Sequence, residues 1–171
     1  MDRSSSGGVP RNLDTSSLPE LVDYDLESVC DNPKSVVEEN SYYLGKTIVI
    51  TGAGGLFGRE GCLYFGRRGA RIAALDQNKA GLKETFDAMQ VELGEDNCFD
   101  FKPYVCDVTN AEQIAQVVDS IVARFQRIDL LWNNAGYQGK IQPALEYDPA
   151  DFARVMNINV TGSCLMPSFD L

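Results

Sequence analysis

The chain has 171 residues, of which 44% are apolar, and it carries a formal net charge of −10 without a single histidine. This length suffices for one compact domain with a single core. The acid excess argues against nucleic acid as a partner, and the lack of histidine excludes His-dependent triads and His-ligated metal sites.

The lack of targeting signals and the spacing of the cysteines favour a cytoplasmic location. No apolar run is long enough to span a bilayer, and the first thirty residues lack the basic start and apolar stretch of a signal peptide. The five cysteines are an odd number at irregular spacings without a C-x-x-C pair. We therefore expect a cytoplasmic protein with no membrane partner, no disulfide framework and no metal site.

Residues 1–42 differ in composition from the rest of the chain. Up to residue 45, nine carboxylates face three basic side chains, and the segment shows no sustained helical or strand period. This composition predicts a disordered or weakly ordered acidic leader over residues 1–42. Residues 43–171 would then form one domain.

From Lys46 onward, strand and helix patterns alternate. The run 47–51 is apolar, β-branched and followed by glycines, as expected of a strand buried on both faces. A helix is predicted from about residue 57 to 68, with Gly69 as its C-terminal cap. Further strands are predicted at 72–75, 101–106 and 130–132, and further helices over the apolar stripes 82–93 and 114–125.

Two helix starts carry recognisable caps. Thr109 and Glu112 have the spacing of a capping box, and Asp148 followed by Pro149 predicts the start of a last helix. Four alternations of strand and helix argue for an α/β fold. We expect the N-terminal portion of a Rossmann-type, doubly wound parallel sheet with about four strands.

The turn after the first strand, residues 51–58, reads TGAGGLFG. A glycine-rich turn that opens a helix leaves backbone N–H groups free, and the helix dipole favours a pyrophosphate there. The alternative is an ordinary tight turn between strand and helix.

Asp76 ends the second strand, 24 residues beyond Gly52. An acid at about this distance accepts hydrogen bonds from the adenosine ribose, and its charge would repel the extra phosphate of NADP. Asp76 therefore favours NAD, unless it is a solvated aspartate that merely opens a turn.

Several motifs occur together in a fixed order: TGAGGLFG at 51–58, Asp76, CDV at 106–108, NNAG at 133–136 and NVTG at 159–162. Through them, residues from Lys46 to about Cys164 resemble the short-chain dehydrogenase/reductase family. Within that family the segments YVCDVT, NNAGYQG and DFARVMNINVTG are most similar to NAD-dependent polyol dehydrogenases of the xylitol type.

The resemblance implies a role for each matching position. Asp107 and Val108 would contact the adenine ring. Asn159 would support a proton relay toward a catalytic lysine, although a helical asparagine can equally be a structural hydrogen-bonding residue. The implied cofactor-binding set is Gly52, Gly54, Gly55, Leu56, Phe57, Gly58, Asp76, Asp107, Val108, Asn133, Ala135 and Gly136.

The family's catalytic serine, tyrosine and lysine have no counterpart in this sequence. The tyrosine and lysine should follow Asn159, yet residues 160–171 contain neither type. The one Y-x-x-x-K pattern, Tyr42 with Lys46, precedes the first strand and should lie at the edge of the sheet opposite the cofactor. Pro167 stands where the family helix would continue, and the last five residues match no family segment.

We therefore expect a chain truncated before its catalytic residues. A changed reading frame, a retained intron, a mispredicted exon or a true early stop would each produce such an ending. Residues 130–132 would form an uncovered edge strand, and each large apolar side chain left in water forgoes roughly 1.5–3 kcal/mol. The isolated chain should then be unstable or associated.

Leu56 is a second departure, because the family usually has glycine at this position. If the turn requires a positive φ there, a leucine would cost about 1–3 kcal/mol, unless Gly55 absorbs the turn.

Two functions remain open. The first is an NAD-dependent short-chain oxidoreductase that converts a polyol or another secondary alcohol to a ketone. Its partners would be the nicotinamide dinucleotide and a small alcohol, and the family's full-length members are usually homo-oligomers. The second is a non-catalytic nucleotide-binding module or pairing partner. For the chain as given, we expect weak NAD binding without turnover.

Overall fold

The structure is a computed structural model that describes residues 42–93 and 100–166. The predicted leader, up to residue 41, and the tail from Pro167 onward lie outside the described residues. The strands are β1 (Thr47–Thr51), β2 (Arg71–Asp76), β3 (Phe101–Val105) and β4 (Leu130–Trp132). The helices are α1 (Leu56–Gly66), α2 (Lys79–Leu93), α3 (Ala111–Phe125), α4 (Pro149–Met156) and α5 (Ser163–Leu165), with a 3₁₀ turn at Ala144–Glu146 and a π-helical segment at Asn157–Gly162.

The four strands form one parallel sheet in the order β3-β2-β1-β4. In β1, Ile48 pairs in register with Ile72 of β2 on one side and with Leu130 of β4 on the other. This arrangement confirms the predicted N-terminal portion of a doubly wound parallel sheet.

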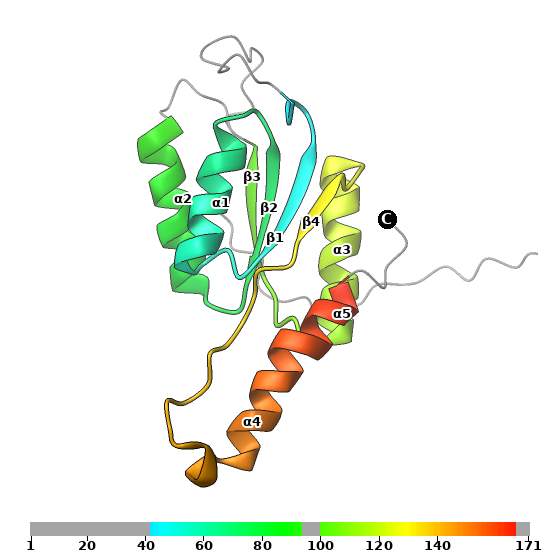
Figure 1. The fold of residues 1–171 in the computed structure, drawn as a ribbon. Helices are drawn as coiled ribbons and strands as arrows, with labels where there is room; N and C mark the ends of the chain where they lie inside the picture. The colour runs from blue at the N-terminus through cyan, green and yellow to red at the C-terminus, as the bar shows by residue number, and fades with distance from the viewer. Residues whose placement is uncertain (1–41, 94–99, 167–171) are drawn as a thin grey trace, which may run out of the picture.

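Helices cover both faces of this sheet, with α1 and α2 on one side and α3 on the other (Figure 1). Because successive side chains of a strand point to opposite faces, β1 contributes to both cores. Ile48 and Ile50 belong to the core under α1 and α2, whereas Val49 belongs to the core under α3. This double burial explains why β1 is apolar without alternation.

One predicted helix end and one predicted helix cap were wrong. Helix α1 ends at Gly66 and not at Arg68, and the left-handed φ of +79° at Gly69 closes the turn that follows. The predicted capping box at Thr109 was also wrong, because the side chain of Asn110 caps α3 by accepting from the backbone N–H groups of Glu112 and Gln113 at 3.1 Å.

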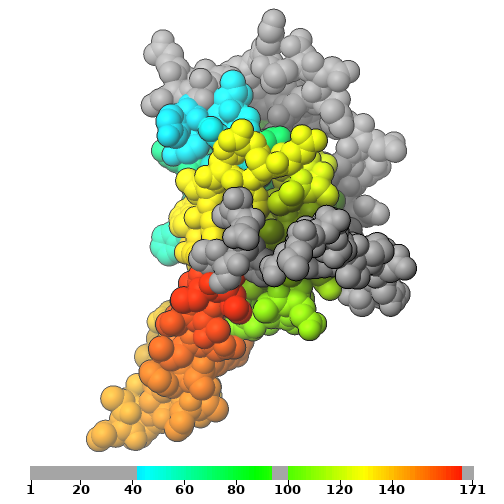
Figure 2. Space-filling view, turned by 90° about the vertical axis from the view of Figure 1, so that its right-hand side faces the viewer, coloured from blue at the N-terminus to red at the C-terminus, as the bar shows by residue number. Residues whose placement is uncertain are grey.

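Residues 149–165, here called the arm, comprise α4, the π-helical segment and α5. Figures 1 and 2 show the arm projecting from the body beyond the C-terminal ends of the strands. Its start was predicted correctly: the Asp148 carboxylate accepts from the backbone N–H of Ala150 at 2.9 Å, and Pro149 is the first helical residue.

Strand β4 lies at the edge of the sheet, with β1 as its one strand neighbour in the described part of the chain. All three of its residues are half-buried. Between β4 and α1 lies a groove of about 620 Å³, whose lining includes the side chains of Phe57, Tyr64, Phe65 and Trp132. The predicted apolar edge is therefore present.

Candidate functional site

A cavity of about 120 Å³, here called the cleft, lies where the strands end and the arm begins. Because β1, β2 and β3 are parallel, the residues that follow them meet at this one edge of the sheet. Six of the predicted cofactor-binding residues line the cleft: Gly52, Asp76, Asp107, Val108, Ala135 and Gly136.

Gly52 is the turning point between β1 and α1. Its φ of +67° lies in the left-handed region, and a Cβ at this position would stand 2.8 Å from the Cα of Ala135. The Thr51 hydroxyl and the amide of Asn134 tie the same two segments together: Thr51 Oγ1 accepts from the N–H groups of residues 134 and 135, each at 3.0 Å, and Asn134 Nδ2 donates to the Thr51 carbonyl at 3.0 Å. Only glycine therefore fits at position 52.

The concern that Leu56 is strained was wrong. Gly52 takes the positive φ, Gly55 has a φ of −88°, and Leu56 begins α1 with a negative φ. The side chains of Leu56 and Phe57 are 70% and 74% exposed, so only their backbone N–H groups face the turn as potential ligands. No side chain among the described residues caps α1 at Gly55, which leaves the first-turn N–H groups available to an anion.

The remaining glycines of the turn hold it against its neighbours. A Cβ at Gly58 would lie 2.2 Å from the Gly52 carbonyl oxygen, and one at Gly54 would lie 3.0 Å from the backbone of Gly81 in α2. The glycines at 54 and 58 therefore serve the close packing of the turn.

Asp76 lies at the end of β2, with its carboxylate turned toward the glycine-rich turn. Oδ2 accepts from the Gly54 N–H at 2.9 Å, and Oδ1 accepts from the Asn78 N–H at 2.8 Å. A carboxylate has about four lone-pair sites, so each oxygen can still accept from a ligand hydroxyl. The contact between Gly54 and Asp76 links two predicted motifs across 22 residues of sequence.

Asp107 and Val108 follow β3. The Asp107 carboxylate accepts from both the N–H and the hydroxyl of Thr109, at 2.9 and 2.8 Å, which fixes its rotamer. Val108 is nearly buried and packs against Gly162 of the arm. The contact between Val108 and Gly162 thus joins the cleft to the arm.

Asn133 and Asn159 turn out to make structural bonds. Asn133 Nδ2 donates to the Ser163 carbonyl at 3.1 Å. Asn159 Oδ1 accepts from the Tyr137 N–H at 2.8 Å, while its Nδ2 donates to the Tyr137 carbonyl at 3.1 Å. Asn159 is thus a structural hydrogen-bonding residue that joins the arm to Tyr137. Its role in a proton relay stays a prediction.

Five residues that line the cleft escaped the sequence prediction: Gln77, Cys106, Tyr137, Arg154 and Ile158. Burial raises the pKa of the Cys106 thiol to about 12, so this group stays neutral. Arg154 and Ile158 lie one helical turn apart, yet no sequence signal shows which face of the last helix meets the cleft.

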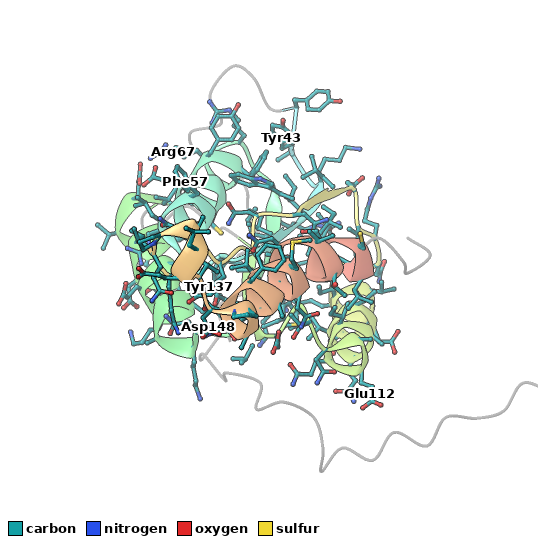
Figure 3. The ribbon with its side chains drawn as sticks, turned by 60° about the horizontal axis from the view of Figure 1, so that its bottom comes forward. Tyr43, Phe57, Arg67, Glu112, Tyr137 and Asp148 are labelled. Atoms are coloured by element: carbon teal, nitrogen blue, oxygen red, sulfur yellow. The ribbon has the colours of Figure 1, made fainter. Side chains whose placement is uncertain are left out.

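The loop between β4 and α4 is held by Asp151, a buried carboxylate that is 6% exposed. It accepts from the Tyr137 hydroxyl at 3.0 Å, from the Tyr147 hydroxyl at 2.8 Å and from the Lys140 N–H at 2.8 Å. The bond from the Lys140 N–H lowers the pKa of Asp151, and the bond to this carboxylate raises the pKa of Tyr147. Figure 3 shows Tyr137 at this end of the molecule, beside α4 and near Asp148.

Tyr42 and Lys46 lie at the opposite end of β1, as expected. Tyr42 is 76% exposed, and Lys46 Nζ contacts the Asp129 carboxylate at 3.4 Å. In Figure 3 the neighbouring Tyr43 stands far from Tyr137. Residues 42–93 and 100–166 contain no cluster of three potential metal ligands, and no helix within them is long and apolar enough to cross a membrane.

Comparison with known proteins agrees with this geometry. The sequence profile described as short chain dehydrogenase matches residues 46–168. D-threitol dehydrogenase from Mycolicibacterium smegmatis is 34% identical over 122 residues, which are 71% of this chain and 45% of that protein.

Two solved structures are also similar. A crystal structure of NAD⁺-bound xylitol dehydrogenase aligns with a TM-score of 0.68 and 40% identity, covering 73% of this chain and 46% of that one. A 3-ketoacyl-(acyl-carrier-protein) reductase from Brucella melitensis, complexed with NADH, aligns with a TM-score of 0.64 and 31% identity, covering 72% and 48%. This chain therefore spans about half the length of these relatives, and it belongs to the short-chain dehydrogenase/reductase family.

Proposed function

We propose that this chain supplies the dinucleotide-binding half of an NAD-dependent oxidoreductase that acts on a polyol or a similar secondary alcohol. The observation that carries the proposal is the contact between Gly54 and Asp76. It brings the uncapped start of a helix, which could bind an anion, and a carboxylate that could bind a ribose together at the mouth of a parallel sheet.

The residues of the cleft fit such a cofactor. The uncapped start of α1 would hold the pyrophosphate, and the lack of a side chain at Gly52 lets the backbone approach it closely. Asp76 would accept from the adenosine ribose, while Asp107 and Val108 would border the adenine. Asn133, Ala135 and Gly136 would lie beneath the cofactor. When bound, the nicotinamide would accept a hydride from the alcohol carbon.

The preference for NAD over NADP follows from charge. A 2′-phosphate placed beside the Asp76 carboxylate would bring two anions together, and neither Gly54 nor Gly55 offers a compensating base. The polyol class is proposed because D-threitol and xylitol dehydrogenases are among the similar proteins.

We also propose that residues 1–171, expressed by themselves, bind the cofactor without turnover, because residues 160–171 hold neither tyrosine nor lysine. A cytoplasmic location is proposed on the free, buried thiols of Cys62 and Cys106, which suit a reducing compartment.

Fluorescence titration with NADH and NADPH tests this proposal. We expect NADH to bind more tightly than NADPH. Asp76→Asn should remove the repulsion of the 2′-phosphate and reduce the ratio of the two dissociation constants by at least about tenfold, which corresponds to about 1.4 kcal/mol. Asp100→Asn is a matched control, because this carboxylate pairs with Arg124 outside the cleft. Equal affinity for both cofactors in the unsubstituted chain would contradict the preference for NAD. NADH formation from any sugar alcohol by the 171-residue chain would contradict the proposed lack of turnover.

A second candidate is a non-catalytic nucleotide-binding module that pairs with another polypeptide. The open edge of β4 and the apolar groove beside it favour this function. Sequencing the transcript across the codon for Leu171 separates the two candidates, because an in-frame serine, tyrosine and lysine downstream would favour the enzyme.

A further inference from the structure

Arg154, on α4, differs from four other arginines of the protein. Arg59, Arg67, Arg124 and Arg127 each pair with a carboxylate. Arg154 has no carboxylate partner within residues 42–93 and 100–166. Its guanidinium carbon instead lies 4.5 Å from the centroid of the Tyr137 ring, and its side chain lines the cleft. The cleft therefore contains a guanidinium that forms no ion pair with the part of the chain that the structure describes.

The ring beneath Arg154 is held firmly. Both backbone polar groups of Tyr137 bond to the Asn159 side chain, at 2.8 and 3.1 Å, and its hydroxyl donates to Asp151 at 3.0 Å. Asp151 is itself buried and held by two further donors. Tyr137 is thus a fixed platform, and the contact with its ring restrains the guanidinium before any ligand arrives.

The position of Arg154 along the cleft points to the adenosine end. The same cavity is lined by Asp76 and Gln77 at the end of β2, and by Asp107 and Val108 after β3. Under the proposed function these residues surround the ribose and adenine, whereas the pyrophosphate belongs at the start of α1. A planar guanidinium with one face on a tyrosine can stack its other face on a purine.

We propose that Arg154 is a further cofactor-contacting residue, whose guanidinium stacks on the adenine ring with Tyr137 as its support. This inference rests on the proposed function and adds an affinity determinant at the adenosine end. Asp76 next to the ribose disfavours the other role open to an unpaired arginine, which is to bind a 2′-phosphate.

Isothermal titration calorimetry with ligand fragments tests the inference on the full 171-residue chain. For Arg154→Ala we expect AMP and NADH to bind about fivefold to tenfold more weakly, which is the lower range for loss of one stacking contact. Nicotinamide mononucleotide should be unaffected, since it lacks adenine. Arg154→Lys keeps the charge but not the plane, so it should restore little of the AMP affinity.

Arg68→Ala is the matched control. Arg68 also stacks on a tyrosine, with its guanidinium carbon 3.8 Å from the Tyr64 ring centroid, but Tyr64 borders the groove beside β4 and not the cleft. This variant should bind AMP and NADH as the unsubstituted chain does. In a double-mutant cycle, Tyr137→Leu should add little to Arg154→Ala, because both changes remove the same stack.

Three outcomes would overturn the inference. Unchanged AMP binding by Arg154→Ala would show that the guanidinium does not touch adenine. An equal loss for nicotinamide mononucleotide would indicate general damage to the site. A loss for 2′,5′-ADP but not for AMP would assign Arg154 to a phosphate. If the unsubstituted chain binds neither AMP nor NADH, the proposed function itself fails, and the inference fails with it.

Discussion

The body of the protein and its arm are stabilised in different ways. In the body, helices on both faces of the sheet bury two apolar cores. In the arm, large apolar side chains are exposed, with Phe152 at 58%, Met156 at 43% and Val160 at 48%. The arm relies on polar contacts, chiefly Asp148 at its cap, Asp151 to the preceding loop and Asn159 to Tyr137. The cleft therefore has one wall fixed by packing and another fixed by hydrogen bonds.

This difference predicts where substitutions act. Damage to the body should lower the free energy of unfolding of the whole domain. Damage to the arm should loosen one wall of the cleft and reduce cofactor affinity, while the body stays folded.

The largest effect is expected from Ile121→Ala, which empties a fully buried position in the core under α3. The free energy of unfolding should fall by about 2–5 kcal/mol, as measured by urea denaturation followed by circular dichroism. Val122→Ala is the control on the same helix, because Val122 is 45% exposed and its loss should change stability by no more than about 0.5 kcal/mol. Similar losses for both variants would show that α3 does not cover a core.

A smaller effect is expected at the junction between the two regions. Gly52→Ala must hold a φ of +67° and also push its Cβ against the backbone of Ala135. It should lower the free energy of unfolding by about 1–3 kcal/mol and weaken NADH binding. Gly45→Ala shares the positive φ, at +70°, but its Cβ would meet nothing within 4 Å.

The difference between these two glycine variants isolates the steric contact from the backbone strain. Gly45→Ala should leave NADH affinity unchanged. Equal effects of both variants on NADH affinity would show that the steric contact between position 52 and Ala135 does not matter for binding.

The smallest expected effect is a pH response confined to the arm. Folding lowers the pKa of Asp151, chiefly through the Lys140 N–H, so its charged form stabilises the loop above the usual carboxyl range near pH 4. That stabilisation is lost as the pH falls through the lowered pKa. NMR signals of the Lys140 amide should therefore titrate below about pH 4, and Asp151→Asn should abolish this titration.

A carboxylate of the body provides the contrast. The Thr47 N–H lowers the pKa of Asp129 to about 2, and this residue joins the start of β1 to the turn before β4. Asp129→Asn should alter the acid dependence of global unfolding and leave the Lys140 titration in place. If Asp129→Asn changed the titration of the Lys140 amide signal, the arm and the body would respond to pH as one unit.

Most of the body could be predicted from the sequence, because its elements obey local rules. The stripe from Ile114 to Phe125 predicted α3, and the parallel topology then brought Gly52, Asp76 and Asp107 to one edge. The choice of cap at α3 failed because Thr109 and Asn110 are both good capping residues, and the Thr109 hydroxyl is bonded to Asp107. Adjacent candidates of this kind are separated only by tertiary contacts.

The arm's share of the cleft could not be predicted in the same way. Tyr137 has no motif of its own, and Arg154 resembles any surface arginine on an amphipathic helix. Their roles depend on how the arm turns against the body, which periodicity within a single helix does not specify. The contact between Tyr137 and Asn159 joins residues 22 positions apart across a loop.

The π-helical segment at Asn157–Gly162 also changes which neighbours the arm meets along its length. Before the segment, Arg154 lines the cleft. Within it, Ile158 lines the cleft and Gly162 contacts Val108, and after it Met166 enters the core under α3. A widened turn accommodates one residue more than an α-helix would, and each residue rotates a helix by about 100°. Deleting a single residue there would therefore rotate Arg154 away from the cleft while Met166 stayed in the core, so one inserted amino acid is enough to give a continuous helix two separate partners.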